Sequence, residues 1–305
     1  MEEKWELRRD DELFPKSLLS DAIRKIEVLY GIGDPTVLES DTVSIIGARR
    51  ATPYGIAIAE MCGRIAAESE ICVVSGGAMG CDYAASRAAL DAGGRTIIVA
   101  GCGADRVYPA SSTDVYRDAV ERGGAVISLD RWGMPPRKCA FPRRNVVIAA
   151  LSPVLVVAEA GERSGTMSTA NAALELDRTI YAVPGSVFSP SSQGTNRLIA
   201  EGAMPICSET DLEMRLSMDY GVMRVVMEGV PSQMGEVVSA LVASPMRPDE
   251  LASRLGMDVL TVLRTLADYE SRGIVEHLID GRYSLTKESY QQYRTTPRLG
   301  GTGEE

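Results

Sequence analysis

Three features of the sequence predict an α/β fold: a doubly wound, mostly parallel sheet with helices on both faces. Strand-like apolar runs and helical patterns alternate with short breaks from residue 42 to about residue 220. Many of the breaks that follow the strands are rich in glycine. The first strand, Val43–Ile46, ends at Gly47, and Pro53 then opens a long helical pattern. This order is typical of the α/β unit, whose ligands bind beyond the carboxyl ends of the strands.

The composition indicates a globular protein with room for one large and one small domain. The chain has 305 residues, of which 45% are hydrophobic and 24% charged, and its net charge is −10. That charge argues against indiscriminate attachment to nucleic acid or to a membrane, but it allows a local basic site. The N-terminus has no apolar signal core, and the run 146–160 is too short to span a bilayer. We therefore expect a cytoplasmic protein.

The elements follow one another in a regular order. Residues 1–41 are predicted to form a short lead-in with one or two helices. Residues 42–220 are predicted to form the α/β domain, in which right-handed crossovers place the strand ends along one rim. The loops on this rim contain Gly47, Gly76-Gly77-x-x-Gly80, Gly101-x-Gly103, and the stretch from Glu159 to Thr166.

The pattern changes near residue 220. Residues 224–285 predict three short helices and a hairpin that turns at Asp280-Gly281, which is the outline of a winged helix. This segment has six arginines and nine acidic residues, a net charge of −3. The apolar residues Val259, Val262, Leu263, Leu266 and Tyr269 of its third helix are expected to face the core. The tail, residues 295–305, is expected to be disordered.

The rim loops predict a site for a phosphate-bearing ligand. Gly47 lets the backbone approach a ligand closely, and the helix that follows attracts anions at its N-terminus. Arg49 and Arg50 belong to the same turn. Ser164 and Thr166 precede another helix, where hydroxyl and backbone N–H groups can hold a phosphate. Gly47 lacks the G-x-G-x-x-G pattern of dinucleotide sites, and the chain lacks the P-loop motif of ATPases.

The loop Arg131–Arg144 indicates the class of ligand. It contains five basic residues and no acidic one, with Trp132 and Phe141 among them. Single strands of nucleic acid are held by cations along the backbone and by aromatic side chains on which bases stack. The alternative is a solvated loop whose Trp132 and Phe141 cover the core. The basic residues are Arg131, Arg137, Lys138, Arg143 and Arg144.

Neither a catalytic nor a metal site is expected. The single histidine, His277, is far from the rim loops in sequence, and the G-x-S-x-G elbow is missing. The six cysteines are scattered without a C-x-x-C pair. No paired spacing singles out acids such as Asp82 and Glu159. We therefore predict that the chain is not an enzyme and that it binds neither a cofactor nor a metal ion.

Several motifs, in order, resemble those of the DNA-processing protein A family (DprA, also called Smf). They cover roughly residues 15–207 and read IIGARRATPYG, VVSGGAMGCDYAASRAAL, GCGADRVYP, FPRRN, VVAEAGERSGTMSTANAALELDRTIYAVPG and GTNRLIAEGA. The resemblance implies a Rossmann-like fold and a non-enzymatic protein that binds single-stranded DNA. It also implies a homodimer that protects incoming DNA and loads the RecA recombinase in natural transformation. The predicted winged helix matches an optional C-terminal domain of the family.

The resemblance also implies roles for particular residues. Arg49 matches the arginine of the first motif, and Lys138 and Phe141 match a strand-contacting lysine and aromatic. Ser86 stands in place of a family histidine, and Val146 stands where an arginine is common. We therefore expect nucleic acid to bind at Gly47, Arg49, Arg50, Gly76, Gly77, Arg137, Lys138, Phe141, Arg143, Arg144, Asn145, Ser164 and Thr166.

Two other functions fit parts of the sequence. The first is a nucleotide-binding or nucleoside-phosphate-cleaving Rossmann-like protein, but the chain lacks the P-G-G-x-G-T-x-x-E signature of such enzymes. The second is a winged-helix regulator that senses a ligand. Its recognition helix, Asp258–Arg272, would carry a net charge of −1, a poor match to duplex phosphates. We favour the single-strand binder.

Overall fold

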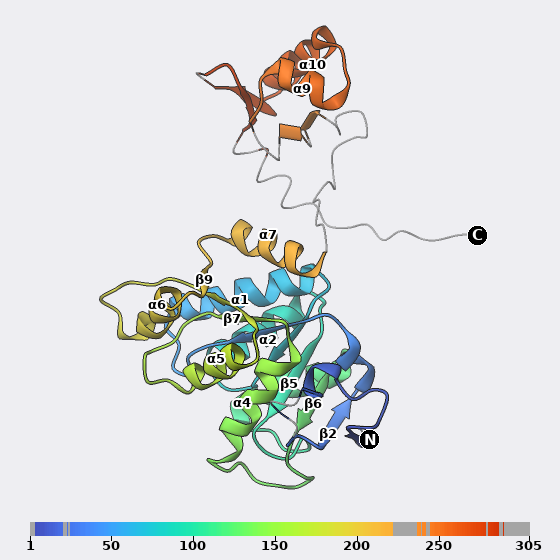
Figure 1. The fold of residues 1–305 in the computed structure, drawn as a ribbon, viewed down its shortest axis with the longest axis vertical. Helices are drawn as coiled ribbons and strands as arrows, with labels where there is room; N and C mark the ends of the chain where they lie inside the picture. Colours follow the sequence, from blue (N-terminus) through green and yellow to red (C-terminus); the bar gives the residue numbers. More distant parts are fainter. Residues whose placement is uncertain are drawn as a thin grey trace, which may run out of the picture. The chain divides into compact units, whose positions relative to one another are not determined.

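The computed structural model describes residues 4–20, 23, 25–221, 237–238, 240–241, 245–278, 280–286 and 289. The chain divides into two compact units, Met1–Met223 and Arg224–Glu305 (Figure 1). The tail predicted at 295–305 lies outside the described residues.

A nine-stranded sheet forms the centre of the first unit within the described residues. Its order is β1-β2-β6-β5-β4-β3-β7-β8-β9, and all neighbours from β6 to β9 are parallel. The mostly parallel α/β sheet predicted from the sequence is therefore confirmed. The strands are β1 (Lys4–Arg8), β2 (Val28–Gly33), β3 (Thr42–Ile46), β4 (Cys72–Ser75), β5 (Thr96–Ala100), β6 (Ala125–Ser128), β7 (Val154–Val157), β8 (Thr179–Ala182) and β9 (Met204–Pro205).

Two antiparallel strands of the described N-terminal residues form a hairpin at the sheet edge. The one or two helices predicted there are only short 3-10 helices, and Val28–Gly33 is a strand instead. β1 and β2 pair antiparallel, and β2 also pairs antiparallel with β6. The Trp5 ring lies over Gly31, which has no Cβ to obstruct it. Leu18 and Ile26 have helix-like spacing in the sequence but pack into the core from short turns. The short 3-10 helices here are η1 (Lys16–Leu18) and η3 (Pro35–Glu39).

Helices cover both faces of the sheet, as Figure 1 shows for α1 and α7 on one side and α4 and α5 on the other. Alternate strand residues supply the two cores: Ile97 and Val99 point to the side of α4, and Ile98 and Ala100 to the side of α3. The helices are α1 (Pro53–Glu68), α2 (Cys81–Asp91), α3 (Thr113–Glu121), α4 (Ala140–Leu151), α5 (Gly165–Glu175), α6 (Gln193–Ala200) and α7 (Glu209–Tyr220), with short 3-10 helices η4 (Ala110–Ser112) and η5 (Pro190–Ser192).

The sheet has a topological switch point between β3 and β7. Strands β4 to β6 lie on one side of β3, whereas β7 to β9 lie on the other. Ligands of open α/β sheets bind outside the carboxyl ends of the strands at such a point. Here the buried Glu159 carboxylate ties the two loops together, because it accepts the N–H of Thr52 at 2.8 Å and its hydroxyl at 2.6 Å. Gly55 leaves room for it, since a Cβ there would collide with the carboxylate.

The second unit contains two helices and a hairpin among its described residues: α9 (Pro248–Leu255), α10 (Val259–Ser271), β10 (Val275–His277) and β11 (Tyr283–Leu285). Gly256, with a φ of +65°, ends α9, and Asp258 caps α10. The expected core face of α10 needs a correction, because Val259 and Leu263 are exposed whereas Val262, Leu266 and Tyr269 are buried. The first helix predicted for this unit lies largely outside the described residues, and the winged-helix assignment stays a prediction.

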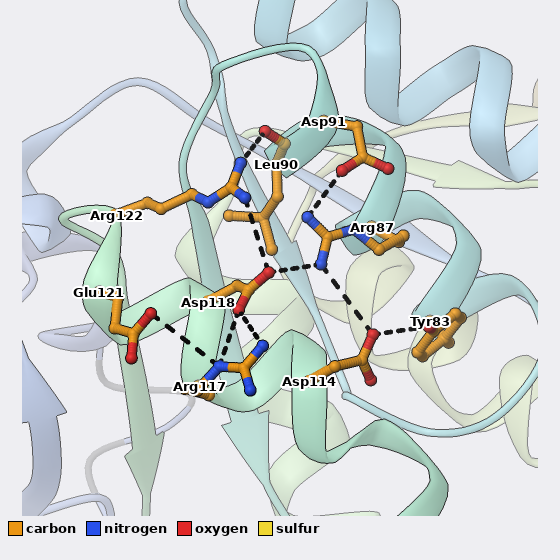
Figure 2. Close-up of polar contacts among 9 residues, drawn as sticks. All are labelled: Tyr83, Arg87, Leu90, Asp91, Asp114, Arg117, Asp118, Glu121 and Arg122. Carbon is orange, nitrogen blue, oxygen red and sulfur yellow. Dashed lines mark hydrogen bonds and ion pairs between the residues drawn. The ribbon is translucent and has the colours of Figure 1, made fainter.

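An ion-pair network joins α2 to α3 (Figure 2). Asp118 accepts hydrogen bonds from Arg87 at 2.7 Å and Arg117 at 2.8 Å, and Arg122 lies 3.7 Å away. The hydrogen bonds from Arg87 and Arg117 hold the pKa of Asp118 below its ordinary value. One carboxylate therefore links side chains from two helices.

We expect Asp118→Asn to lower the melting temperature at neutral pH, because it removes the shared charge of the network. The depressed pKa means that this stabilisation is present above the pKa of the unfolded carboxyl and is lost as pH falls through the folded value. The difference in melting temperature from the wild type should therefore shrink in acid, and also in high salt. Glu121→Gln is the control, because it also removes one carboxylate from α3 but loses a longer contact, of 3.9 Å to Arg117. We expect it to lower the melting temperature less than Asp118→Asn does. Equal melting temperatures for all three proteins at neutral pH would contradict this role.

We expect Glu159→Gln to lower the free energy of unfolding by about 1–3 kcal/mol, because an NH2 group replaces one of the two oxygens that accept from Thr52 and leaves a buried donor unpaired. Urea denaturation measures the difference. The control is Glu162→Gln, an exposed carboxylate in the same loop that is 3.8 Å from Arg197. If the two variants unfold at the same urea concentration, Glu159 does not hold the loops together.

Candidate functional site

A cleft of about 840 Å³ opens at the switch point. Its walls are the loops after β3, β7 and β8, Tyr108 of the loop after β5, and the N-terminal turns of α4 and α5. It brings together residues far apart in the sequence, such as Gly47 and Thr166, which are 119 positions apart and whose contact is a hydrogen bond of 2.9 Å from the Thr166 hydroxyl to the Gly47 carbonyl. The predicted site residues that line the cleft are Gly47, Arg49, Arg50, Lys138, Phe141, Arg144, Asn145, Ser164 and Thr166.

Three exposed cations stand on the walls of this cleft: Arg49, Arg50 and Lys138. Within the described part of the chain none of them forms an ion pair with a carboxylate, unlike Arg137 and Arg143 in the same basic stretch, which both pair with Asp130. Their charge is therefore available to a ligand.

Arg144 is a fourth cation, and it is only 5% exposed. Its guanidinium fills the space beside Gly76, where a Cβ would collide with Nη1. Burial lowers the pKa of Arg144, and the nearby charge of Asp82 opposes that shift. Burial in turn raises the pKa of Asp82, against the charge of Arg144 and the N–H groups of Ala78 and Gly47. Among the described residues Nε of Arg144 is a buried donor without a hydrogen-bond partner.

Phe141 lies half-buried beneath two of these guanidinium groups. The Cζ atoms of Arg49 and Arg144 are 4.9 and 5.9 Å from its ring centroid, which is cation–π geometry. Its ring packs against Gly101, where a Cβ would lie 2.6 Å from Cε1. The Tyr108 ring lies 5.9 Å away, tilted by 46°, and is 44% exposed. Sequence reasoning did not select Tyr108, although the Tyr-Pro after the Gly103 loop was one of the matched motifs.

The N-terminus of α5 faces the cleft. Ser164 is the residue before the helix, and its buried Oγ has no hydrogen-bond partner among the described residues. Gly165 and Thr166 of the first turn also line the cleft, and Asn145 of α4 donates to the Gly165 carbonyl at 3.4 Å. A helix N-terminus with a free hydroxyl group is a suitable place for an anion.

The other predicted site residues lie outside the cleft. Gly76 lies behind Arg144 and lines a small adjoining pocket with Arg49. Gly77, with a φ of +64°, packs against Ile98 and Tyr116.

Two basic residues are committed to an internal pair instead. Arg137 and Arg143 lie 2.9 and 3.5 Å from the buried Asp130 carboxylate. Trp132 also lies elsewhere, edge-on to Tyr30 at 5.4 Å and with Lys4 4.9 Å from its ring, so it covers the N-terminal hairpin.

Cys62 and Cys72 are buried, and burial raises the pKa of each thiol to about 12. Such thiols form little of the reactive thiolate at neutral pH. In the part of the chain that the structure describes, no cluster of three His, Cys, Asp or Glu side chains could hold a metal ion. No described helix has both the length and the apolar character needed to cross a bilayer.

Known proteins resemble this chain over the unit that contains the cleft. The family model described as DNA recombination-mediator protein A matches residues 6–217. The DNA processing protein DprA of Streptococcus pneumoniae is 36% identical over 202 residues, which cover 66% of this chain and 71% of that protein. Protein Smf of Escherichia coli is 33% identical over 207 residues, 67% of this chain. The match spans only 54% of the Escherichia coli protein, about half its length.

Two solved structures resemble the fold. The X-ray structure of DprA from Streptococcus pneumoniae has a TM-score of 0.63 at 34% identity, and covers 68% of this chain and 72% of that one. DNA processing protein A of Helicobacter pylori, solved for its single-stranded DNA binding mode, has a TM-score of 0.62 at 29% identity, covering 72% of this chain and 99% of that one. The match to the family model and the identities of these relatives show that the chain belongs to the DNA recombination-mediator protein A family, also called DprA or Smf.

Proposed function

We propose that this chain binds single-stranded DNA in the cleft, protects incoming DNA and loads the RecA recombinase in natural transformation. The observation that carries the proposal is the set of four cations in the cleft, Arg49, Arg50, Lys138 and Arg144, in a chain whose net charge is −10. Family membership supports it, because the structure of the Helicobacter pylori member concerns the single-stranded DNA binding mode of that protein.

Phosphate groups fit the inner part of the cleft. Nε of Arg144 and Oγ of Ser164 both lack a partner among the described residues. A phosphate that accepted hydrogen bonds from them would remove the cost of leaving buried donors unpaired, and its bond to Arg144 would be charge-assisted. The exposed Arg49, Arg50 and Lys138 would then contact further phosphates along the strand.

The bases would meet aromatic surface. Tyr108 is partly exposed, and Phe141 lies beside it under Arg49. Every base has a π-face, so stacking of this kind tolerates any sequence. We therefore propose binding without sequence preference.

We propose a binding role without catalysis. Two acidic groups in the region of the cleft are already engaged by the fold: Glu159 accepts two hydrogen bonds from Thr52, and Asp82 faces the N–H groups of Gly47 and Ala78. Neither carboxylate is placed as a free general base.

RecA and a second copy of this chain are the proposed protein partners. This part rests on family membership. The exposed Met214 and Met218 of α7 are apolar surface of the kind found in protein contacts. Light scattering of the full chain tests the dimer, and RecA assembly on strands coated with the protein tests the loading role.

We expect Arg49→Ala and Lys138→Ala each to weaken binding of an oligothymidylate by about tenfold or more, because each removes a charge-assisted contact. The slope of log affinity against log salt should fall by roughly 0.7 for each phosphate that the variant no longer neutralises. Arg137→Ala is the matched control from the same loop, and it should change both quantities less because Arg137 is paired with Asp130. Fluorescence anisotropy at several salt concentrations measures them. Wild-type affinity and slope in both cleft variants would overturn the assignment.

The second unit is not expected to bind duplex DNA. A helix that reads a major groove must offer cations and base-reading groups on its outer face. On α10 the exposed apolar residues are Val259, Leu260 and Leu263, and the stretch Asp258–Arg272 has a net charge of −1. A chain ending at Tyr220 should therefore keep most of the single-strand affinity, and a fragment of residues 222–290 should leave duplex DNA unshifted in an electrophoretic assay. Micromolar duplex binding by that fragment at physiological salt would instead favour the regulator.

A further inference from the structure

The loop between β8 and α6 exposes an unusual side chain. Phe188 is 92% exposed, more than any other large apolar side chain among the described residues, and its neighbour Val187 is 76% exposed. The chain has three phenylalanines in all, and this one contributes nothing to a core. Contiguous exposed apolar surface is typical of ligand and partner contacts, and Val187 and Phe188 are adjacent.

The position of Phe188 is defined by the hydrogen bonds of its loop. At the base of the loop, Asn196 exchanges two hydrogen bonds with the Gly185 backbone, at 3.0 and 3.1 Å. The Tyr54 hydroxyl donates to the carbonyl of Pro184 at 2.8 Å. At the tip, the Phe188 N–H donates to the Ser186 hydroxyl at 3.2 Å. The ring is therefore presented to solvent by an organised turn.

The same loop forms one wall of the cleft. Pro190 and Ser191, which directly follow the tip, line it. At the far end of the loop, the Gly194 N–H donates to the Ala160 carbonyl at 2.8 Å, which fixes the loop against the β7–α5 connection. In Figure 1 this loop stands out at the left edge of the first unit, where it enters α6.

Tyr108 and Phe188 belong to loops that follow strands on opposite sides of the switch point. Tyr108 follows β5, and the loop of Phe188 follows β8, while β4, β3 and β7 lie between them. Four strand intervals of about 4.8 Å separate β5 from β8, or about 19 Å. Several nucleotides of an extended strand fit across that distance, and the cleft residues Arg49 and Ser164 belong to the loops after the intervening strands β3 and β7.

We propose that Phe188 is a second base-stacking residue, which holds a base of the strand whose phosphates lie in the cleft. The inference rests on the proposed function and adds a subsite to it. The stretch 183–196 has no charged residue, so this wall offers nothing to a phosphate beyond hydroxyl and backbone groups. An unstacked nucleobase of a single strand offers a flat face that can stack on the exposed Phe188 ring.

The test compares substitutions at the loop tip by anisotropy with a long oligothymidylate. Phe188→Ala should bind about 5- to 150-fold more weakly with an unchanged salt slope, because the variant cannot stack a base but still meets every phosphate. Phe188→Trp should restore the affinity, whereas Phe188→Leu, which keeps apolar area but has no π-face, should not. Val187→Ala is the matched control and should bind like the wild type. All four variants should keep the wild-type melting temperature, since the side chains are exposed.

The outcomes separate this subsite from the proposed function. In one outcome the wild type binds the strand, Lys138→Ala weakens binding, and Phe188→Ala binds as tightly as the wild type. The stacking role of Phe188 is then wrong, whereas single-strand binding in the cleft is retained. Loss of self-association in Phe188→Ala with unchanged affinity would likewise overturn it, since the ring would then contact a second copy of the chain. If the wild type does not bind single strands, both proposals fail.

Discussion

The cleft depends on one buried guanidinium group. Arg144 fits there because Gly76 has no side chain and because Asp82 supplies the opposite charge. A charge taken out of water costs several kcal/mol unless it is compensated, so Arg144 and Asp82 stabilise each other in this position. Asp82 is itself held by the N–H groups of Gly47 and Ala78. The loops after β3 and β4, helix α2 and helix α4 are thus joined by electrostatics as well as by packing.

The sequence could predict the sheet and the rim because both depend on local patterns. Apolar runs of strand length alternate with helical spacing, and that alternation together with right-handed crossovers places the loops after parallel strands on one side. Gly47, Arg49 and Ser164 lie near one another for this reason. The motifs that resemble the family lie largely in these loops, so the resemblance and the topology locate the same region.

What the sequence could not show was which distant groups pair with one another. The basic loop contains no acidic residue, yet Asp130 immediately precedes it and turns back to Arg137 and Arg143. Glu159 and Thr52 are 107 positions apart, and no pattern in the sequence links them. The N-terminal hairpin was missed because its apolar residues suit either period, and only pairing with β6 selects the strand.

The N-terminal hairpin leaves the ribosome long before its partner in the sheet. β2 ends at Gly33 and β6 begins at Ala125, so 92 positions of chain separate them. At roughly 5–20 residues per second, translation of that length takes about 5–20 s. Throughout this interval the β2 edge that later meets β6 has no native strand beside it, and an unpaired edge is a template for other chains. The nascent chain is therefore exposed to misassociation along the β2 edge, as it is along the β3 edge, whose partner β7 begins 108 positions after Ile46.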